Sequence, residues 1–436
     1  VEAGKLEEWK ISPTVPAGAR PTLPYFLQKP LTGALYDWSG IPANVRGEPF
    51  QQPPLLATAI VRAGGTTIGL TREVTYRYRD EATGEVRHPL RVVPDIEVTV
   101  DPALIVWPQG RWEPLPLEIT VTSNGRNPVA GTVEVLAPPG WPTPKPRPFS
   151  LAKKGDRDQV EILLTPGGRP SAGRFAVGVR ALTADGKRFD SSIRLIDYEH
   201  IRPTPDARPS TIALTALPLQ LPALSAVGYV RGASDRVPEA LAAVGIPVRV
   251  LTGDDLDHGD LSRFDAIVVG SRAYETDPVL AGANGRLLDY ARGGGLVIVQ
   301  YQQYQFVERG FAPAKLEIAR PHDRVSDETA KVTFLDPKHP IFSTPNPIGL
   351  ADWEGWVQER GLYFARAWDP AYTPLLEMAD PGGPPQKGGL LVATLGKGRY
   401  VYTGLAFFRQ LPAGVPGAYR LFANLLAWKD GRPPRP

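Results

Sequence analysis

The chain has 436 residues and a formal net charge of +3, with 42% apolar and 22% charged residues. These values are typical of soluble globular proteins and argue against wholesale disorder. So small a charge, without blocks of basic residues, makes nucleic acid an unfavourable partner. The absence of cysteine excludes disulfides, thiolate metal ligands and a cysteine nucleophile. The 48 prolines and 44 glycines favour short strands and turns over a helical bundle.

The length predicts two to four domains, at roughly 100–200 residues each. No signal peptide follows Val1, which we interpret as a processed or truncated end. The uncharged stretch 211–230 is long enough to span a bilayer, but Pro218, Gln220 and Pro222 interrupt its centre. Two short strands around a proline linker are expected there, and no membrane span. A single methionine and many arginines suggest a thermophile or a high-GC genome.

Residues 1–95 and 96–203 are predicted to be β-rich. The first segment begins with an irregular proline-rich stretch, followed by a few runs typical of strands. These strands are too few for an independent β-sandwich. In the second, apolar or alternating runs recur about every 10–15 residues, as in an immunoglobulin-like β-sandwich. The expected strands of this sandwich are 96–100, 115–121, 129–135, 159–164, 175–182 and 191–196.

In residues 204–430 short apolar strands alternate with helices. The expected strands are 227–230, 248–251, 265–270 and 296–299, and the expected helices are 235–243 and 284–292. Strands separated by helices imply a parallel sheet covered on both faces. The sequence therefore predicts a multidomain β + α/β protein, whose sandwich-like segments precede a flavodoxin-like or amidotransferase-like doubly wound parallel-sheet domain.

Several stretches resemble the C-terminal region of long bacterial PIG-L/LmbE-like deacetylases. They are residues 198–203, 228–235, 264–274 and 286–290, with WVQERGLYF at 356–364 and FFRQLPAGVPGAYR at 407–420. The resemblance covers most of residues 190–428, and residues 15–95 resemble the β region that precedes it in the same family.

This resemblance implies a secreted or periplasmic parent enzyme that deacetylates N-acetyl sugars. In that family a His-Pro-Asp-Asp-Glu motif marks the zinc site of an N-terminal catalytic domain, and this sequence lacks the motif. The resemblance thus implies an accessory region without a cofactor or catalytic residue of its own, with that catalytic domain as partner and zinc expected only there. The last domain also resembles class I glutamine amidotransferases, but Val299-Gln300-Tyr301-Gln302 stands where their cysteine nucleophile lies.

A cluster of aromatic and polar residues follows residue 350 and is a candidate sugar-binding site. Sugars are commonly held by aromatic ring faces with carboxylate, amide and guanidinium groups at the rim. The candidates are Trp353, Trp356, Gln358, Glu359 and Arg360. The alternative is that the tryptophans fill the core and that Glu359 and Arg360 are structural.

A second set of candidates is expected at the carboxyl ends of the predicted strands, where ligands of open α/β sheets bind in a crevice. These candidates are Arg272, Tyr274, Gln300, Tyr301, Arg324, Asp327, Glu328, Arg409 and Gln410. The alternative is a buried arginine–carboxylate network that stabilises long loops.

No metal site is predicted, because catalytic zinc needs about three converging ligands. Of the five histidines, His322 and His339 adjoin proline and are expected in loops.

Three functions remain open. The first is a carbohydrate-binding or domain-positioning accessory region of a deacetylase, with a neutral or acidic glycan as ligand. The second is a structural or self-assembling secreted fragment that associates through exposed strand edges. The third is a hydrolase with an unrecognised site.

Overall fold

The computed structural model describes residues 5, 8–16, 18–29, 31–32, 35–168 and 171–429. Val1, interpreted above as a processed or truncated end, lies outside them. The chain divides into two compact units. Unit 1 comprises Val1–Ala103, Pro114–Thr165 and Val177–Ile212; unit 2 comprises Leu104–Glu113, Pro166–Ala176 and Ala213–Pro436. This division does not separate residues 1–95 from 96–203, so the expected three-domain organisation stays a prediction.

Unit 1 begins with a short 3-10 helix, η1 (Tyr25–Leu27), and two β-hairpins. The hairpin strands are β1 (Leu56–Ala63) with β2 (Thr66–Glu73), and β3 (Thr75–Asp80) with β4 (Gly84–Pro89). Gly64 and Gly65 join β1 to β2 with φ of +56° and +80°, a turn whose twist suits a two-residue hairpin loop. The turn at 80–84 joins β3 to β4, and the Asp80 carboxylate accepts hydrogen bonds there from the backbone N–H groups of Ala82 and Thr83.

The rest of unit 1 is a β-sandwich. One sheet has the order β10–β7–β5, and in the other β8 lies between β11 and β9, with β12 beside β11. The strands are β5 (Ile96–Asp101), β7 (Leu115–Ser123), β8 (Val129–Leu136), β9 (Arg147–Leu151), β10 (Arg157–Leu164), β11 (Gly173–Thr183) and β12 (Arg188–Phe189). Alternate residues point inward, as Leu117, Ile119 and Val121 do on β7, and these are at most 1% exposed. A further hairpin, β13 (Ser191–Ile196) with β14 (Thr204–Pro209), follows.

Unit 2 is organised around a seven-stranded sheet with the order β17–β16–β18–β19–β26–β25–β23. The strands are β16 (Val227–Val230), β17 (Val248–Val250), β18 (Ala266–Val269), β19 (Leu296–Gln300), β23 (Tyr372–Pro374), β25 (Leu390–Leu395) and β26 (Gly398–Thr403). The first five strands in that order run parallel, whereas β25 and β23 are antiparallel to their neighbours. At the start of unit 2, β6 (Leu104–Pro108) pairs in parallel with the end of β15 (Thr211–Leu217).

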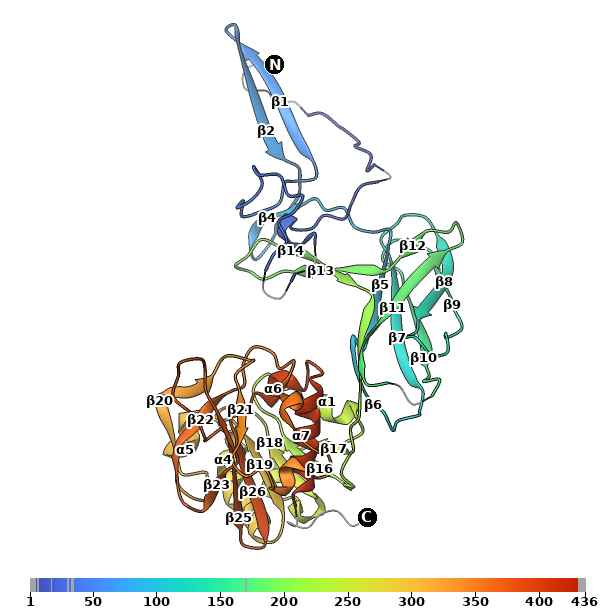
Figure 1. Ribbon diagram of the computed structural model, residues 1–436. Coiled ribbons are helices and arrows are strands. Elements are labelled where there is room, and N and C mark those ends of the chain that lie inside the picture. The colour runs from blue at the N-terminus through green and yellow to red at the C-terminus, as the bar shows by residue number, and fades with distance from the viewer. Residues whose placement is uncertain are drawn as a thin grey trace. The chain divides into compact units, whose positions relative to one another are not determined.

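Helices pack on this sheet through two apolar clusters (Figure 1). α1 (Val237–Ala243) and α7 (Pro416–Ala427) join one cluster, and α4 (Pro278–Arg292) joins the other. The remaining helices are α2 (Gly253–Asp257), α3 (Ala273–Thr276), α5 (Tyr304–Glu308), α6 (Phe407–Gln410) and the 3-10 helices η2 (Leu261–Arg263), η3 (Pro340–Phe342) and η4 (Leu350–Trp353).

The predicted doubly wound, flavodoxin-like or amidotransferase-like parallel sheet is wrong. The chain is mostly β, with 39% strand and 16% helix. Between β19 and β26 the chain forms β-pairs instead of a long crossover helix: β20 (Leu316–Val325) with β22 (Gly361–Trp368), and β21 (Val332–Phe334) with β24 (Leu376–Met378). The β25–β26 hairpin then adds antiparallel strands. The seven-stranded sheet is therefore mixed.

The uncharged stretch 211–230 contains the strands β15 and β16, as expected. Within the described residues, no helix is both long and apolar enough to cross a membrane.

Candidate ligand-binding site

The most distinctive charged group of unit 2 is the carboxylate of Glu359, which is buried at 1% exposure. It accepts hydrogen bonds from Arg324 Nη2 at 2.5 Å and from Arg409 Nε at 2.7 Å. The two arginine side chains remain 47% and 35% exposed. We call these three residues the arginine–glutamate cluster. Its formal charge is +1, and its two guanidinium groups reach the surface from a buried anchor.

The backbone on both sides of Glu359 is held in an unusual conformation. Gln358 and Tyr363 have φ of +68° and +52°, a region that costs a non-glycine residue about 1–3 kcal/mol. The buried Gln410 side chain holds the first of these turns, because its Oε1 accepts from Val357 N at 2.8 Å and its Nε2 donates to Val357 O at 2.9 Å. The neighbouring helix α6 thus helps to fix the position of Glu359, whose own N–H also donates to Val357 O at 2.8 Å.

A stack of rings borders the cluster. The rings of Tyr301 and Tyr363 are 5.5 Å apart and nearly parallel, and the His322 ring stacks on Tyr363 at 3.9 Å. Phe408 contacts Tyr301 at 5.1 Å. Burial raises the pKa of both tyrosines. Burial, with a smaller contribution from the Arg324 charge, lowers the pKa of His322. We expect uncharged rings in this stack at neutral pH.

Arg272 lies at the carboxyl end of β18 and begins α3 with φ of +62°. Its backbone N–H donates to the Tyr301 carbonyl at the end of the neighbouring strand β19. Its guanidinium pairs with Glu275, through Nε at 2.9 Å and Nη2 at 2.5 Å, and stays 36% exposed. Arg272 therefore adds a charge-compensated group next to the ring stack.

Buried polar atoms without a hydrogen-bond partner occur at the same strand ends. Among the described residues they include Ser271 Oγ, Gln300 Oε1 and His322 Nε2. Gln300 Nε2 donates to Tyr229 OH, which donates to Asp235, each at 2.7 Å. Burial raises the pKa of the Asp235 carboxyl. Most buried polar groups of folded proteins are hydrogen-bonded, and other unpartnered atoms occur elsewhere in the described chain, as at Trp353 and Tyr400.

Trp353 and Trp356 do not offer ring faces to a ligand. They are 4% and 3% exposed, stack on each other at 4.9 Å and belong to the apolar core. Arg360 is also buried and donates to the carbonyls of Ala330 and Trp353, and burial lowers its pKa to about 10. The predicted aromatic sugar-binding surface is therefore a core cluster. Two tryptophans close together in the sequence are compatible with either role, so the pattern alone could not distinguish them.

The other predicted residues are distributed around the site. Tyr274 packs on Phe311 at 4.7 Å and bonds Asn284, so it is a core residue. Asp327 caps its own turn by accepting from Thr329 N, and Glu328 is exposed. Gln358 is exposed beside Glu359. The structure brings Arg272, Tyr301, Arg324, Glu359 and Arg409 together, with Gln300 and Gln410 supporting them from the interior.

The sequence analysis did not place His322 or Phe408 in the site, whereas Tyr363 was noted next to the cluster after residue 350. His322 was expected in a loop but lies in β20, two residues from Arg324. The alternation of apolar Leu316 and Ile318 with exposed Glu317 was a signal for the start of this strand. No group of three or more metal-binding side chains occurs within the described ranges.

No family model matches the chain, and no curated protein matches it. Solved structures that are similar to it include the following three. The apo-form Calx CBD1 domain has 6% identity, a TM-score of 0.18, and coverage of 28% of this chain and 99% of that chain. AggA, the major subunit of aggregative adherence fimbriae type I from Escherichia coli, has 11% identity and a TM-score of 0.19. The match covers 29% of this chain and 98% of that chain. WR4, an MSP family member of C. elegans, has 13% identity and a TM-score of 0.17. The match covers 28% of this chain and 97% of that chain.

Scores this low carry no argument about fold or function. The resemblance to long PIG-L deacetylases therefore stays a prediction.

Proposed function

We propose that unit 2 is a non-catalytic binding domain for a carbohydrate that carries carboxylate groups, and that the arginine–glutamate cluster holds one of those carboxylates. The observation that carries this proposal is the buried Glu359 with two half-exposed arginines. A buried carboxylate that orients two guanidinium groups toward solvent pre-organises donors for a planar anion.

The exposure of the arginines favours binding over a purely structural network. In a structural network the guanidinium groups are covered and their donors are satisfied within the protein. Here, among the described residues, Arg324 and Arg409 each use one nitrogen for Glu359. Several N–H groups of each arginine remain for a ligand.

The charge of the cluster selects among carbohydrates. Two arginines outweigh one glutamate, and Arg272 is balanced by Glu275, so the site attracts anions. The ring stack beside it offers little apolar surface, since Tyr301 and Tyr363 are only 7% and 9% exposed and stack on each other, so the charge carries the selection. An acidic sugar suits this combination better than a neutral one. We expect weak binding, with a dissociation constant of about 10 μM to 1 mM, since an open site loses contact energy to desolvation.

Calorimetric titration of the full chain with an oligomer of galacturonic acid, and with the neutral galactose oligomer of equal length, tests the proposal. We expect the acidic oligomer to bind and the neutral one to bind at least tenfold more weakly. Arg409→Gln should weaken acidic binding about tenfold or more, because a hydrogen bond to a charged group contributes about 1.5–3 kcal/mol.

Arg366→Gln is the matched control. Arg366 lies on β22, pairs with the buried carboxylate of Asp323 and is 63% exposed, but it is not part of the cluster. The Arg366→Gln variant should bind the acidic oligomer as tightly as the unmodified chain does. Equal binding of the two oligomers, or equal losses in Arg409→Gln and Arg366→Gln, would overturn the proposal.

The role as an accessory region of a sugar deacetylase is compatible with this binding function and stays a separate prediction. Acidic-sugar binding would bring a neighbouring catalytic domain to a polysaccharide.

A further inference from the structure

Unit 1 contains a small pocket whose wall is mostly apolar. Its lining residues all belong to unit 1 and come from the irregular N-terminal segment, the ends of β2 and β4 and the residues around the start of β14. Prolines are the commonest of them, and Phe26, Phe50 and Leu90 add further apolar surface. The cavity has a volume of about 90 Å³. We call it the proline pocket.

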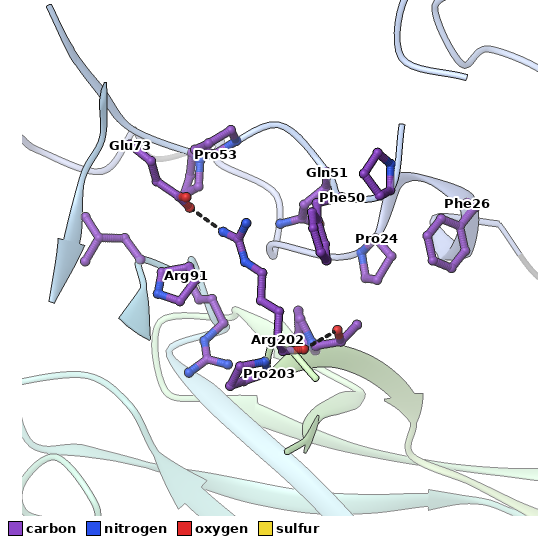
Figure 2. A pocket seen from close by; sticks show the side chains of 15 residues that line it. Pro24, Phe26, Phe50, Gln51, Pro53, Glu73, Arg91, Arg202 and Pro203 are labelled. Atoms are coloured by element: carbon purple, nitrogen blue, oxygen red, sulfur yellow. Dashed lines mark hydrogen bonds and ion pairs between the residues drawn. The ribbon is translucent and has the colours of Figure 1, made fainter. Parts of the chain in front are cut away.

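The wall of the proline pocket is held in place by rigid residues and by an ion pair. A proline ring fixes φ and leaves the side chain almost no freedom. Arg202 Nη2 donates to Glu73 at 2.5 Å, and the Arg202 guanidinium lies 5.1 Å from the centre of the Phe50 ring (Figure 2). Because such a wall is already ordered, little freedom is lost when a small ligand binds.

The proline pocket carries an uncompensated positive charge. Among the described residues that line it, Glu73 is the only acidic one, and it pairs with Arg202. Arg91 also lines the pocket, is half-buried, and has a buried Nη1 with no hydrogen-bond partner in the described part of the chain. Two guanidinium groups against one carboxylate leave a formal charge of +1. Partial burial of an unpaired charge is unfavourable, so an anion beside Arg91 would stabilise the pocket.

We propose that the proline pocket binds a small aliphatic carboxylate. The carboxylate lies beside Arg91, and the hydrocarbon chain contacts the prolines and Phe50. A cavity of about 150 Å³ accommodates benzene, so the smaller space of about 90 Å³ fits a branched chain of about four carbon atoms. An oligosaccharide is too large for this space. The ligand class therefore differs from the acidic carbohydrate proposed for unit 2.

The lining favours a carboxylate over inorganic phosphate. Phosphate sites in proteins commonly supply several backbone N–H groups to the phosphate oxygens. Proline has no backbone N–H, so a wall made largely of proline offers few such donors. A carboxylate has two oxygens, and a single guanidinium group can hold both of them. Arg91 together with an apolar wall is therefore suited to a carboxylate on a short hydrocarbon chain.

Saturation-transfer NMR titration of the full chain with isovalerate tests this inference. We expect a dissociation constant of about 0.1–1 mM, since so small a ligand makes few contacts. Isovaleramide has the same hydrocarbon chain without the charge, and it should bind at least tenfold more weakly. Inorganic phosphate at the same concentration should not displace isovalerate.

Substitution of Arg91 identifies the charged group that holds the ligand. Arg91→Gln should weaken isovalerate binding at least tenfold and leave isovaleramide binding unchanged. Arg87→Gln is the matched control, because Arg87 lies on β4, is 64% exposed and pairs with Glu85. This control should bind isovalerate as tightly as the unmodified chain does. Arg409→Gln should do the same, which separates the proline pocket from the arginine–glutamate cluster.

Phe50→Ala is a second variant that decides the case in which Arg91→Gln disturbs the fold and loses both ligands. The Phe50 ring is 50% exposed, so its removal should cost little stability, and both ligands should bind at least threefold more weakly. Unchanged binding in Phe50→Ala would refute the proposal. So would absence of isovalerate binding, displacement by phosphate, equal losses in Arg91→Gln and Arg87→Gln, or a loss in Arg409→Gln.

Discussion

Replacing Trp356 by alanine separates a core role from a ligand-binding role. The side chain is 3% exposed, stacks on Trp353 at 4.9 Å, lies 6.1 Å from the Phe407 ring centre and donates from Nε1 to Asp352 O at 3.0 Å. Truncating a buried tryptophan costs about 3–5 kcal/mol. At about 2–4 °C per kcal/mol for a unit of this size, unit 2 should melt about 6–20 °C lower.

Hydrogen-exchange mass spectrometry measures this effect in the full chain, because peptides from β22 and α7 report on unit 2 alone. Their protection should fall by about 3–5 kcal/mol in Trp356→Ala, while peptides from β7 in unit 1 stay unchanged. Trp112→Ala is the control, since that ring is 53% exposed and its loss should cost under about 0.5 kcal/mol. Unchanged protection in Trp356→Ala, with loss of acidic-sugar binding, would refute the core assignment and restore the ring as a binding surface.

Two further predictions concern stability. A Cβ at Gly417 would lie 1.8 Å from Asp352 O, whereas a Cβ at Gly282, inside α4, meets nothing within 4 Å. Gly417→Ala should therefore destabilise unit 2 by about 3 kcal/mol or more, and Gly282→Ala should stabilise it by about 0.5–1 kcal/mol, in urea unfolding. Burial and Arg324 lower the pKa of His322 below its usual 6.5, so the unfolded chain takes up this proton first. Stability should fall as pH decreases below about 6.5, and His322→Phe should reduce that fall; an identical pH profile in the variant would contradict this.

The strands that pack in the centre of each unit could be predicted from the sequence. Uninterrupted apolar runs gave the strands at 227–230 and 296–299, which correspond to β16 and β19. The α4 helix was predicted to begin at 284 but begins at Pro278. The signal for its true start was present, because Asp277 precedes a proline, as N-cap residues often do. In the structure its carboxylate accepts from the backbone N–H groups of Val279 and Leu280.

The sheet class could not be obtained in the same way. Periodicity shows that an apolar run is a strand, but not the direction in which it enters the sheet. β25 and β26 are joined by a turn at Gly396, with φ of +60°, and this hairpin makes one side of the sheet antiparallel. His322, in β20, was expected in a loop because it adjoins Pro321.

The composition of the candidate site was predictable, but its geometry was not. Arginine, glutamate and tyrosine were expected at the strand ends, yet the sequence could not show which rings were exposed. The tryptophans are core residues, whereas the smaller rings of Tyr301 and Tyr363 border the arginines. Side chains from β20, β22 and α6 meet there only because the insertion between β19 and β26 folds back on the sheet.

Backbone strain gives an independent reason to place function at this edge. The non-glycine residues with positive φ among the described positions are Ser234, Arg272, Gln358 and Tyr363. Arg272, Gln358 and Tyr363 lie in or next to the arginine–glutamate cluster, and each costs about 1–3 kcal/mol that glycine would avoid. This strain supports the ligand-binding role that we propose for the arginine–glutamate cluster.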